Sequence, residues 1–323
     1  MKIPTNEIRG SRILITGGAG FLGTHLAERL CSEAEVILFD NFRRNSIPWA
    51  PLLARDRNVS QISGDVLDVL SLEDALRGVD TVVHLAAIAG VSSYYNEALL
   101  TLRVNILGTV NLLEAAIKNK VKRFIHFSTS EVFGPDALWV QETSPLGIGP
   151  VSDRRWVYAT SKLAGEHFAL RYAEEHHFWA TVVRPFNIYG PRQSGEGAVG
   201  NFCRAAITGQ PLTVYGEGSA IRAWCYVSDL VDGVATILHT PDSAGQVFNL
   251  GNPREVETTL GLARRIAALV PGATIRMQAV ERAEVRARVP SIDRARKMLG
   301  FEPKVDLEQG LRSTLDWFRQ AGA

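Results

Sequence analysis

A tyrosine and a lysine four residues apart could act together on a hydroxyl group. Tyr158 and Lys162 lie in the segment YATSK, within a helical pattern that spans Val157–His176. Residues four apart share one face of a helix, so the two side chains should meet. A lysine ammonium stabilises the phenolate of a neighbouring tyrosine, and we therefore predict a lowered pKa for Tyr158. Such a pair could remove a proton from a substrate hydroxyl, with Lys162 also holding a ribose.

Polar residues end the strand expected over Arg123–Ser128. Thr129, Ser130 and Glu131 follow this strand directly. We expect Thr129 or Ser130 to complete the hydrogen bonds at a carbon that is oxidised. Ligands of open parallel sheets bind at the carboxyl ends of the strands, so this segment should lie at the reaction centre.

The first strand of the chain leads into a glycine turn. Its sequence over Ile13–Gly23 is ILITGGAGFLG. This spacing of glycines allows a tight turn, a close approach of backbone to a pyrophosphate, and a helix whose N-terminus faces phosphate. The next strand ends at Asp40, where a carboxylate would accept the ribose hydroxyls of NAD and disfavour the 2′-phosphate of NADP. The alternative is a plain strand–turn–helix with a surface aspartate, and Arg43 and Arg44 are the residues that would favour NADP.

The ends of the following strands extend this predicted NAD site. We expect Asp65 to meet the adenine amine and Val66 to pack on the adenine ring. His84 is expected to satisfy a hydrogen bond in the core rather than to take part in chemistry. The residues predicted to line the cofactor site are Gly17, Gly20, Phe21, Leu22, Gly23, Asp40, Asn41, Asp65, Val66, Leu85, Ala86, Ala87, Tyr158, Lys162 and Pro185.

Short β-branched runs alternate with longer helical patterns up to about residue 190. Strands joined by helical crossovers run parallel, and near-continuous apolar strands fit a sheet covered on both faces. The fold class is therefore α/β, with a Rossmann-like doubly wound parallel sheet and a smaller, interwoven C-terminal α/β lobe. The expected strands are Ile13–Thr16, Val36–Asp40, Val59–Ser63, Thr81–Leu85, Arg123–Ser128, Ala180–Arg184 and a returning Val247–Leu250. The expected helices include Phe21–Ser32, Ser71–Arg77, Glu97–Asn119, Val157–His176 and Glu308–Gln320.

The two lobes are expected to exchange chain segments. We assign residues 1–185 and about 225–250 to the NAD-binding domain. Residues 186–224 and 251–323 are assigned to a domain that binds the substrate.

The composition excludes several classes of protein. The 323 residues carry 35 Lys and Arg against 34 Asp and Glu, a net charge of +1. Proteins that coat nucleic acid or anionic membranes need a clear basic excess, so neither partner is expected. Three cysteines, none in a CxxC pair, predict no disulfide framework and no metal site, and a reducing cytoplasmic setting. No uncharged apolar stretch approaches the ~18 residues of a membrane span, and the polar N-terminus lacks the core of a signal peptide.

Motifs from Ile13 to about Phe318 resemble those of the extended short-chain dehydrogenase/reductase family. This family contains the NAD-dependent nucleotide-sugar epimerases, dehydratases and decarboxylases. The motifs that carry the resemblance are TGGAGFLG (16–23), HLAA (84–87), STSEVFG (128–134), YATSK (158–162), RPFNIYGPR (184–192), LTVYGEGSAIRAWCYVSDLVDGV (212–234), FNLGNP (248–253) and RVPSIDRARKMLGFEP (288–303). Together they are specific for the family.

The resemblance implies a shared reaction cycle on a nucleotide sugar, with UDP as the expected nucleotide. Tyr158 and NAD would oxidise the C4 hydroxyl of the sugar to a ketone. The C-terminal lobe would hold the nucleotide, with Asn187, Arg222 and Arg288 on the diphosphate or sugar and Tyr215 beside the base. Arginine also suits phosphate on physical grounds, because its guanidinium binds two oxygens at once.

The resemblance also implies a homodimer. In the relatives, the helices equivalent to Glu97–Asn119 and Val157–His176 form a four-helix interface, and both patterns here carry apolar residues on more than one face. The alternative is that both helices are simply buried against the sheet.

The residues after Thr129 separate the reactions of the family. Dehydratases place an Asp-Glu pair where this chain has Ser130 and Glu131, so the acid is missing and dehydration is disfavoured. The triplet Thr-Ser-Glu resembles the UDP-glucuronate decarboxylases. A C4 ketone lies β to the C6 carboxylate, so CO2 can leave, while Glu131 could handle the C5 proton and Arg288 could meet the carboxylate. We therefore predict UDP-glucuronate decarboxylation.

Two alternatives remain open. A nucleotide-sugar 4-epimerase, acting on UDP-glucose or UDP-glucuronate, needs only Tyr158, Lys162 and a roomy sugar pocket. A non-catalytic NAD(P)-binding sensor or scaffold is the alternative from a different class, and the presence of both Tyr158 and Lys162 argues against it.

Overall fold

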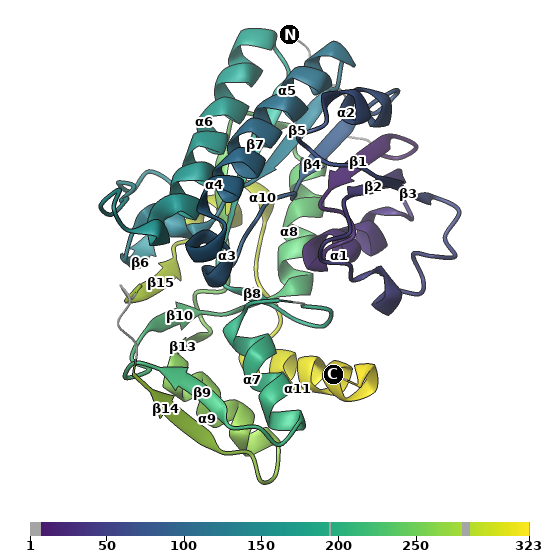
Figure 1. The fold of residues 1–323 in the computed structure, drawn as a ribbon. Helices are drawn as coiled ribbons and strands as arrows, with labels where there is room; N and C mark the ends of the chain where they lie inside the picture. Colours follow the sequence, from purple (N-terminus) through teal and green to yellow (C-terminus); the bar gives the residue numbers. More distant parts are fainter. Residues whose placement is uncertain (1–7, 194, 280–284, 323) are drawn as a thin grey trace.

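A seven-stranded parallel sheet forms the centre of the computed structural model, which describes residues 8–193, 195–279 and 285–322 (Figure 1). The strand order is β12-β7-β5-β4-β1-β2-β3, and every neighbouring pair is parallel. The strands are β1 (Arg12–Thr16), β2 (Glu35–Asp40), β3 (Val59–Ser63), β4 (Thr81–His84), β5 (Arg123–Phe127), β7 (Trp179–Pro185) and β12 (Val247–Leu250). The predicted sheet, including the return of the last strand, is confirmed.

The order of the strands creates the place for a ligand. The chain runs outward from β1 through β2 and β3, and then crosses back to place β4 on the other side of β1. The loops that follow β1 and β4 therefore diverge and leave a crevice at the carboxyl edge of the sheet. β4 and β5 are buried along their whole length, including the polar His84 and His126, as inner strands of a sheet covered on both faces are.

Helices cover both faces of the sheet. One face is packed by α1 (Phe21–Leu30), α8 (Val227–His239) and α10 (Asp293–Leu299). The other face is packed by α2 (Val69–Ala75), α5 (Gly108–Lys118) and α6 (Val157–His176). In Figure 1, α5 and α6 run side by side on the near face of the sheet. The predicted bounds of α6 are confirmed.

The helix predicted over Glu97–Asn119 is confirmed over Ala98–Lys118, with a π-helical turn inside it. It consists of α4 (Ala98–Leu102), a π-helical turn (Arg103–Leu107) and α5. Asn105 in this turn accepts the Ile88 N–H at 2.8 Å and donates to the Ile88 carbonyl at 3.1 Å, which ties the turn to the strand end next to it. Insertions of this kind widen a helix locally and are common near functional sites.

The prediction about membrane spans concerned uncharged stretches, and the same segment carries Arg103 and Glu114. Ala98–Lys118 is long and apolar enough to cross a membrane by length and composition alone, a test that buried core helices also pass. Here the segment packs between α2 and α6, and the buried side chains of Leu112 and Leu113 contribute to the core beneath it.

The second lobe is built from smaller sheets. Its largest sheet has the order β13-β10-β15-β6, beside two-stranded sheets β11-β8 and β14-β9. These strands are β6 (Asp136–Val140), β8 (Ile188–Tyr189), β9 (Leu212–Tyr215), β10 (Ile221–Ala223), β11 (Cys225–Tyr226), β13 (Val256–Thr258), β14 (Ile275–Gln278) and β15 (Ala287–Pro290). The helices α7 (Ala198–Ile207), α9 (Thr259–Leu269) and α11 (Leu307–Ala321) share one apolar core and lie at the bottom of Figure 1.

Two segments cross the boundary that we assigned between the domains. β6 lies in the range given to the first domain but pairs with β15 of the second lobe. α10 lies in the range given to the second domain but packs on α8 and β12. The short elements that complete the chain are α3 (Val91–Asn96) and single 3-10 turns at Ile47–Trp49, Ser130–Phe133, Arg154–Trp156 and Pro241–Ser243.

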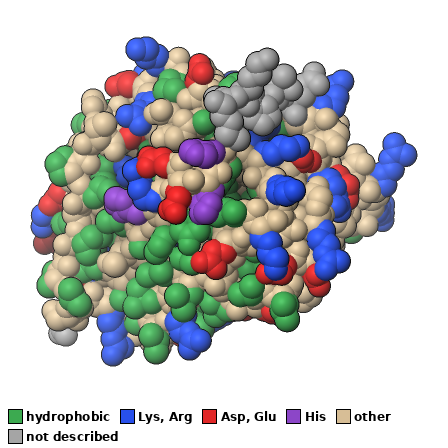
Figure 2. Space-filling model, turned by 90° about the horizontal axis from the view of Figure 1, so that it is seen from above, with side chains coloured by type: hydrophobic (Ala, Val, Ile, Leu, Met, Phe, Trp, Pro, Cys, Tyr) green, Lys and Arg blue, Asp and Glu red, His purple; other side chains and the backbone are tan. Residues whose placement is uncertain are grey.

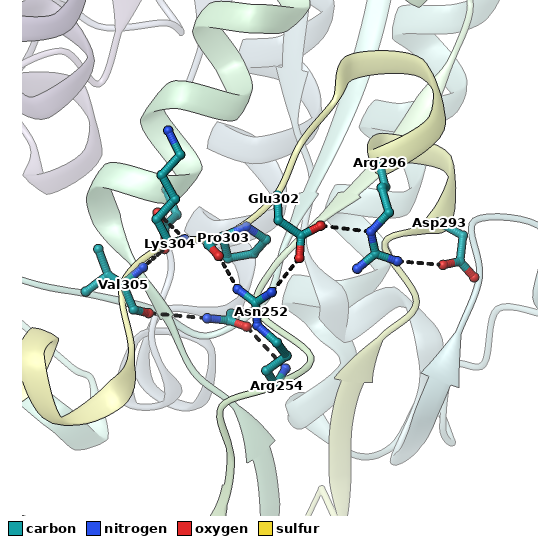
Figure 3. A network of polar contacts seen from close by, with 9 residues as sticks. Asn252, Arg254, Asp293, Arg296, Glu302, Pro303, Lys304 and Val305 are labelled. Carbon is teal, nitrogen blue, oxygen red and sulfur yellow. Dashed lines mark hydrogen bonds and ion pairs between the residues drawn. The ribbon is translucent and has the colours of Figure 1, made fainter.

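A polar network fastens the segment after α10 to the first lobe (Figure 3). Asp229 of α8 accepts the backbone N–H groups of Lys304 and Val305 at 3.0 and 3.2 Å. Glu302 pairs with Arg254 and with Arg296, the latter at 2.8 Å. The network holds the turn after β12, the end of α10 and α8 together, so the two lobes meet at a fixed junction.

Candidate active site

A cavity of about 420 Å³ opens at the carboxyl edge of the large sheet, where the strand order predicts a ligand. Every residue that the sequence predicted for the cofactor site lies on its wall. The wall also contains residues outside that prediction, among them Ser93, Gln193 and Glu196. The cavity therefore gathers the glycine turn, the strand ends and the tyrosine–lysine pair in one place.

The glycine turn has no room for side chains. Gly17 has a φ of +70°, and a Cβ there would lie 2.8 Å from the Ala86 nitrogen. A Cβ on Gly23 would lie 2.6 Å from the Gly17 carbonyl oxygen. The two glycines thus let the turn pack tightly on the segment after β4 and on the start of α1, and both line the cavity, as expected for a pyrophosphate site.

Asp40 ends β2 on the wall of the cavity. Its carboxylate accepts the N–H of Ala19 at 3.0 Å and the N–H of Phe42 at 2.7 Å. Burial raises the pKa of this carboxyl, against the lowering effect of its backbone hydrogen bonds. Asp40 therefore also fixes the shape of the glycine turn, a role that spacing alone does not indicate. Arg43, which could favour NADP, pairs with Glu97 at 2.6 Å.

His84 is a core residue, as expected. Its Nδ1 lies 2.7 Å from the Thr16 hydroxyl and its Nε2 lies 2.8 Å from the Thr109 hydroxyl. The Thr109 hydroxyl donates to the Asn105 carbonyl at 2.7 Å, so it must accept the proton on Nε2. Burial and the charge of Lys162 lower the pKa of His84 to about 3, so the ring is neutral.

Lys162 is buried beneath the cavity with only 2% of its surface exposed. Burial lowers its pKa to about 8, and the charge of Glu166 opposes this shift. Glu166 accepts the Ser128 hydroxyl and pairs with Arg184 at 2.6 Å. The carboxylate is thus satisfied by Arg184 independently of Lys162.

The predicted effect on Tyr158 is wrong in direction. Burial and the charge of Glu131 raise the pKa of this phenol, while a hydrogen bond from Thr129 and the charge of Arg44 lower it by less. The spacing of Tyr158 and Lys162 places them on one helix face, but it does not include the loss of solvent or the nearby carboxylate.

Three arginines converge on Glu131. Arg155 pairs with it at 3.2 Å between Nη2 and Oε1. The charges of Arg288 and Arg222 lower the pKa of Glu131, although burial raises it overall. The second carboxylate oxygen of Glu131 is buried and has no hydrogen-bond partner among the described residues. This cluster carries more positive than negative charge and suits an anionic ligand.

Strand pairing brings two of these arginines together. β10 pairs with β15 in a register that sets Arg222 opposite Arg288. Arg288 is 2% exposed and donates through Nη1 to the carbonyls of Gly134 and Ala287, while its Nη2 has no partner among the described residues. Burial and the two neighbouring arginines lower the pKa of Arg288 to about 10, against the raising charge of Glu131.

The predicted substrate residues are only partly gathered. Arg222 and Arg288 lie near Glu131. None of the four residues predicted for the substrate lines the cofactor cavity: Asn187, Arg222, Arg288 and Tyr215. Asn187 donates to the Ala223 carbonyl at 3.0 Å, beside the strand that carries Arg222. Tyr215 is 56% exposed at the end of β9. Arg155 is a site residue that the sequence did not predict, although its position three residues before Tyr158 was a signal.

Comparison with known proteins shows to which family a chain with these motifs belongs. The NAD-dependent epimerase/dehydratase family matches residues 13–251. A UDP-N-acetyl-alpha-D-glucosaminuronate decarboxylase of Bacillus cytotoxicus is 36% identical, over 96% of this chain and 98% of the relative. The chain belongs to the NAD-dependent epimerase/dehydratase family.

Other members are similarly close. UDP-glucuronic acid decarboxylase 1 of Xenopus tropicalis is 36% identical, over 96% of this chain and 72% of the relative. The solved structure of UDP-glucuronic acid 4-epimerase from Bacillus cereus, in complex with UDP-glucuronic acid and NAD, superposes with a TM-score of 0.87 at 30% identity. The match covers 96% of this chain and 99% of that one.

The cavity of this family member fits its cofactor, NAD. The glycine cradle, formed by Gly17, Gly20 and Gly23, lines the cavity at the start of α1, where the N–H groups of a helix N-terminus suit a pyrophosphate. Asp40 lies on the same wall, where it suits the ribose of NAD better than the 2′-phosphate of NADP. The family, the cradle and the carboxylate agree on the cofactor.

Proposed function

We propose that this enzyme removes the C6 carboxylate of a UDP-linked uronic sugar, with UDP-glucuronate as the first candidate, after oxidation at C4. One observation carries the proposal: Arg155, Arg222 and Arg288 surround Glu131, which also acts electrostatically on Tyr158. An acidic sugar bound there brings its carboxylate to Arg222 and Arg288 and its C4 hydroxyl to the tyrosine.

The cofactor and substrate occupy neighbouring sites in this account. The cavity residues from the glycine turn to Lys162 would hold NAD, and Asp40 would accept its ribose hydroxyls. The nucleotide sugar lies on the side of the second lobe, with Arg222 and Arg288 on its anionic groups and Asn187 and Tyr215 further along it. The relatives named as uronate decarboxylases support this choice of substrate.

Tyr158 exchanges the proton of the C4 hydroxyl, and Thr129 orients the phenol by its hydrogen bond. NAD, when bound, supplies the reversible hydride acceptor that makes a C4 ketone accessible. In the 4-keto sugar, the bond between C5 and the carboxylate carbon breaks, CO2 leaves, and the electron pair enters the ketone as an enolate. C5 then takes up a proton, and return of the hydride to C4 and of the proton from Tyr158 to the C4 oxygen gives a product lighter than the substrate by CO2 alone.

Glu131 is the candidate donor of that proton. It is placed beside Tyr158 and the arginines, and burial raises its pKa, which favours a group able to carry a proton. Ser130 at the preceding position has no acid to offer for loss of water. The side chains of this segment therefore suit loss of CO2 better than dehydration.

A 4-epimerase is the second candidate, because the similar solved structure is a UDP-glucuronic acid 4-epimerase. Epimerisation shares the oxidation by Tyr158 and the grip on the carboxylate. It differs in that the bond between C5 and the carboxylate carbon stays intact and the ketone is reduced on its other face.

The alternative from a different class is a non-catalytic nucleotide sensor. For such a protein, Tyr158→Phe would leave biological activity intact.

We also propose a homodimer that uses the surface of the α4–α5 segment. Leu99, Leu100 and Leu107 expose between 39% and 70% of their surface along this segment. Viewed from above, hydrophobic side chains gather over a broad part of the molecule (Figure 2). A monomeric mass at micromolar concentration by light scattering would overturn this proposal.

We also propose a reducing cytoplasmic setting for the enzyme. The free thiols of Cys31, Cys203 and Cys225 support it.

The experiment that tests the function is incubation of the enzyme with NAD and a panel of UDP sugars. The panel contains glucuronate, N-acetylglucosaminuronate, glucose and galactose, and the products are read by mass spectrometry and proton NMR. A product lighter by one CO2 from a uronate supports the proposal. An isobaric product inverted at C4 replaces decarboxylation with epimerisation, and no turnover of any sugar refutes both.

A further inference from the structure

Arg155 occupies a fixed position just before the catalytic helix. It is the middle residue of the 3-10 turn Arg154–Trp156, which leads directly into α6. Asp153 caps this turn by accepting the Arg155 N–H at 2.8 Å, and Trp156 is buried on the other side. The backbone on both sides of Arg155 is thus held, so the side chain leaves from a defined point three residues before Tyr158.

The guanidinium of Arg155 divides between two partners. Its Nη2 pairs with Glu131 at 3.2 Å, and its Nη1 donates to the hydroxyl of Tyr94. The guanidinium carbon also lies 5.2 Å from the centre of the Tyr94 ring. The side chain is 11% exposed, so both contacts are made largely away from solvent, where charge-assisted contacts are strongest.

Tyr94 connects this arginine to the catalytic tyrosine. Its side chain is 1% exposed, and its ring stacks on that of Tyr158 with centroids 6.3 Å apart and planes inclined by 19°. Such offset stacking fixes the orientation of both rings. Arg155 and Tyr94 are therefore linked with Tyr158 and Glu131 in one set of contacts, in which the charge of Glu131 also acts on Tyr158.

We infer that Arg155 is a positioning residue. Its Nη2 holds the carboxylate of Glu131, and its Nη1 holds the ring of Tyr158 through Tyr94. The inference rests on the proposed function only in that Tyr158 is taken to exchange the C4 proton. It applies equally to decarboxylation and to epimerisation.

The neighbouring arginine provides a matched control. Arg154 lies in the same turn, is exposed, and donates to the backbone carbonyl of Tyr95 at 2.8 Å. Arg154→Met removes the same kind of side chain from the same turn without touching Glu131, Tyr94 or Tyr158. Arg155→Lys keeps one charge but cannot reach two partners at once.

The first test measures the C4 oxidation step, read as NADH absorbance in single turnovers with the UDP sugar that the wild type uses. Arg155→Met should lower the rate constant of this step by about 100-fold, as for a misplaced reacting group, while the KM for the sugar changes far less. Arg155→Lys should recover part of this loss, and Arg154→Met should behave as the wild type. A rise in KM with an unchanged rate constant would instead make Arg155 a substrate-binding residue and overturn the inference.

The second test needs no turnover. The phenolate absorbance of Tyr158 is titrated with pH, after subtraction of a Tyr158→Phe variant. Removing the positive charge of Arg155 should raise the apparent pKa of Tyr158, and the shift should largely disappear in a Glu131→Gln background, because the arginine acts through that carboxylate. Equal shifts in both backgrounds, or none in either, overturn the inference.

The two tests separate the failure of the inference from the failure of the proposed function. If the wild type turns over no UDP sugar, the proposed function falls, and the titration still decides whether Arg155 acts through Glu131. If turnover is normal but Arg155→Met matches Arg154→Met in both readouts, only the inference falls. Thermal midpoints of all variants show whether Arg155→Met is folded, and Arg155→Lys serves in its place if it is not.

Discussion

Glu131 and Tyr158 are coupled: the carboxylate raises the pKa of the phenol from its position at the end of β5. A tyrosine that takes a proton must first be deprotonated, so its activity rises with pH up to its pKa. Glu131→Gln removes the negative charge and should lower the pKa of Tyr158. The rate of C4 oxidation, followed as NADH formation in single turnovers, should then reach its plateau on the order of one pH unit earlier. An unchanged profile, or one displaced to higher pH, would contradict the coupling.

We expect the buried charge of Lys162 to lower the stability of the protein although activity requires this residue. A buried lysine with a pKa of about 8, against ~10.4 in the unfolded chain, costs about 3 kcal/mol of stability at pH 7. Lys162→Met removes this charge, and Glu166 keeps its partner Arg184. The variant should therefore lose activity but gain stability in urea denaturation at pH 7, and the gain should shrink as the pH rises from about 8 to ~10.

The exposed Lys118 supplies the control for that experiment. Lys118→Met removes a surface lysine that pairs with Glu73, and it should change the free energy of unfolding by less than about 0.5 kcal/mol. A destabilised Lys162→Met protein, or a gain independent of pH, would show that burial of the charge is not costly.

The glycine turn predicts a specific loss of cofactor. Gly17→Ala brings a Cβ to 2.8 Å from the Ala86 nitrogen at a φ of +70°, and should lower the affinity for NAD at least roughly tenfold. Gly209 has a φ of +67° with nothing within 4 Å, so Gly209→Ala carries the same backbone strain, about 1 kcal/mol, without the clash. Calorimetric titration with NAD checks the pair, and equal affinities in the two variants would remove the turn from the cofactor site.

We expect the carboxylate of Asp40 to give the enzyme its preference for NAD over NADP. Asp40→Ser removes the negative charge from the wall that also carries Arg43 and Arg44. The ratio of NADP to NAD affinity should rise roughly tenfold, because a 2′-phosphate no longer meets a carboxylate. Asp65→Ser, on the same wall, should leave the ratio near that of the wild type. If both variants shift the ratio alike, or neither does, Asp40 does not select the cofactor.

Features that depend on short stretches of sequence were predictable. The glycine turn, the end of β2 and the start of α6 are fixed by a few neighbouring residues, and each lies where the pattern predicted. The seven strands of the large sheet were found to within one residue at each end, because apolar β-branched runs between turns define them.

Features that depend on distant segments were not predictable. The partnership of Arg155 with Tyr94 requires α3 and the turn before α6 to meet, and no local pattern encodes that contact. The pKa of Tyr158 depends on burial and on Glu131, which spacing from Lys162 does not include. β6 joined the second lobe because its partner β15 lies far along the chain.

The irregularity of the predicted long helix has the same origin. Its π-helical turn follows from the two hydrogen bonds of Asn105 with Ile88, which belongs to another segment. A helical pattern read along one segment cannot reveal such a tie.

The central claim is that the C6 carboxylate of a UDP-linked uronate leaves after oxidation at C4. It is tested most directly with UDP-glucuronate labelled at C6 with a heavy carbon isotope, mixed with the enzyme and NAD and followed by NMR and by mass spectrometry of the released gas. The account predicts labelled CO2 and an unlabelled pentose nucleotide from the wild type, and neither from Tyr158→Phe. Full retention of the label in a product inverted at C4 would contradict it.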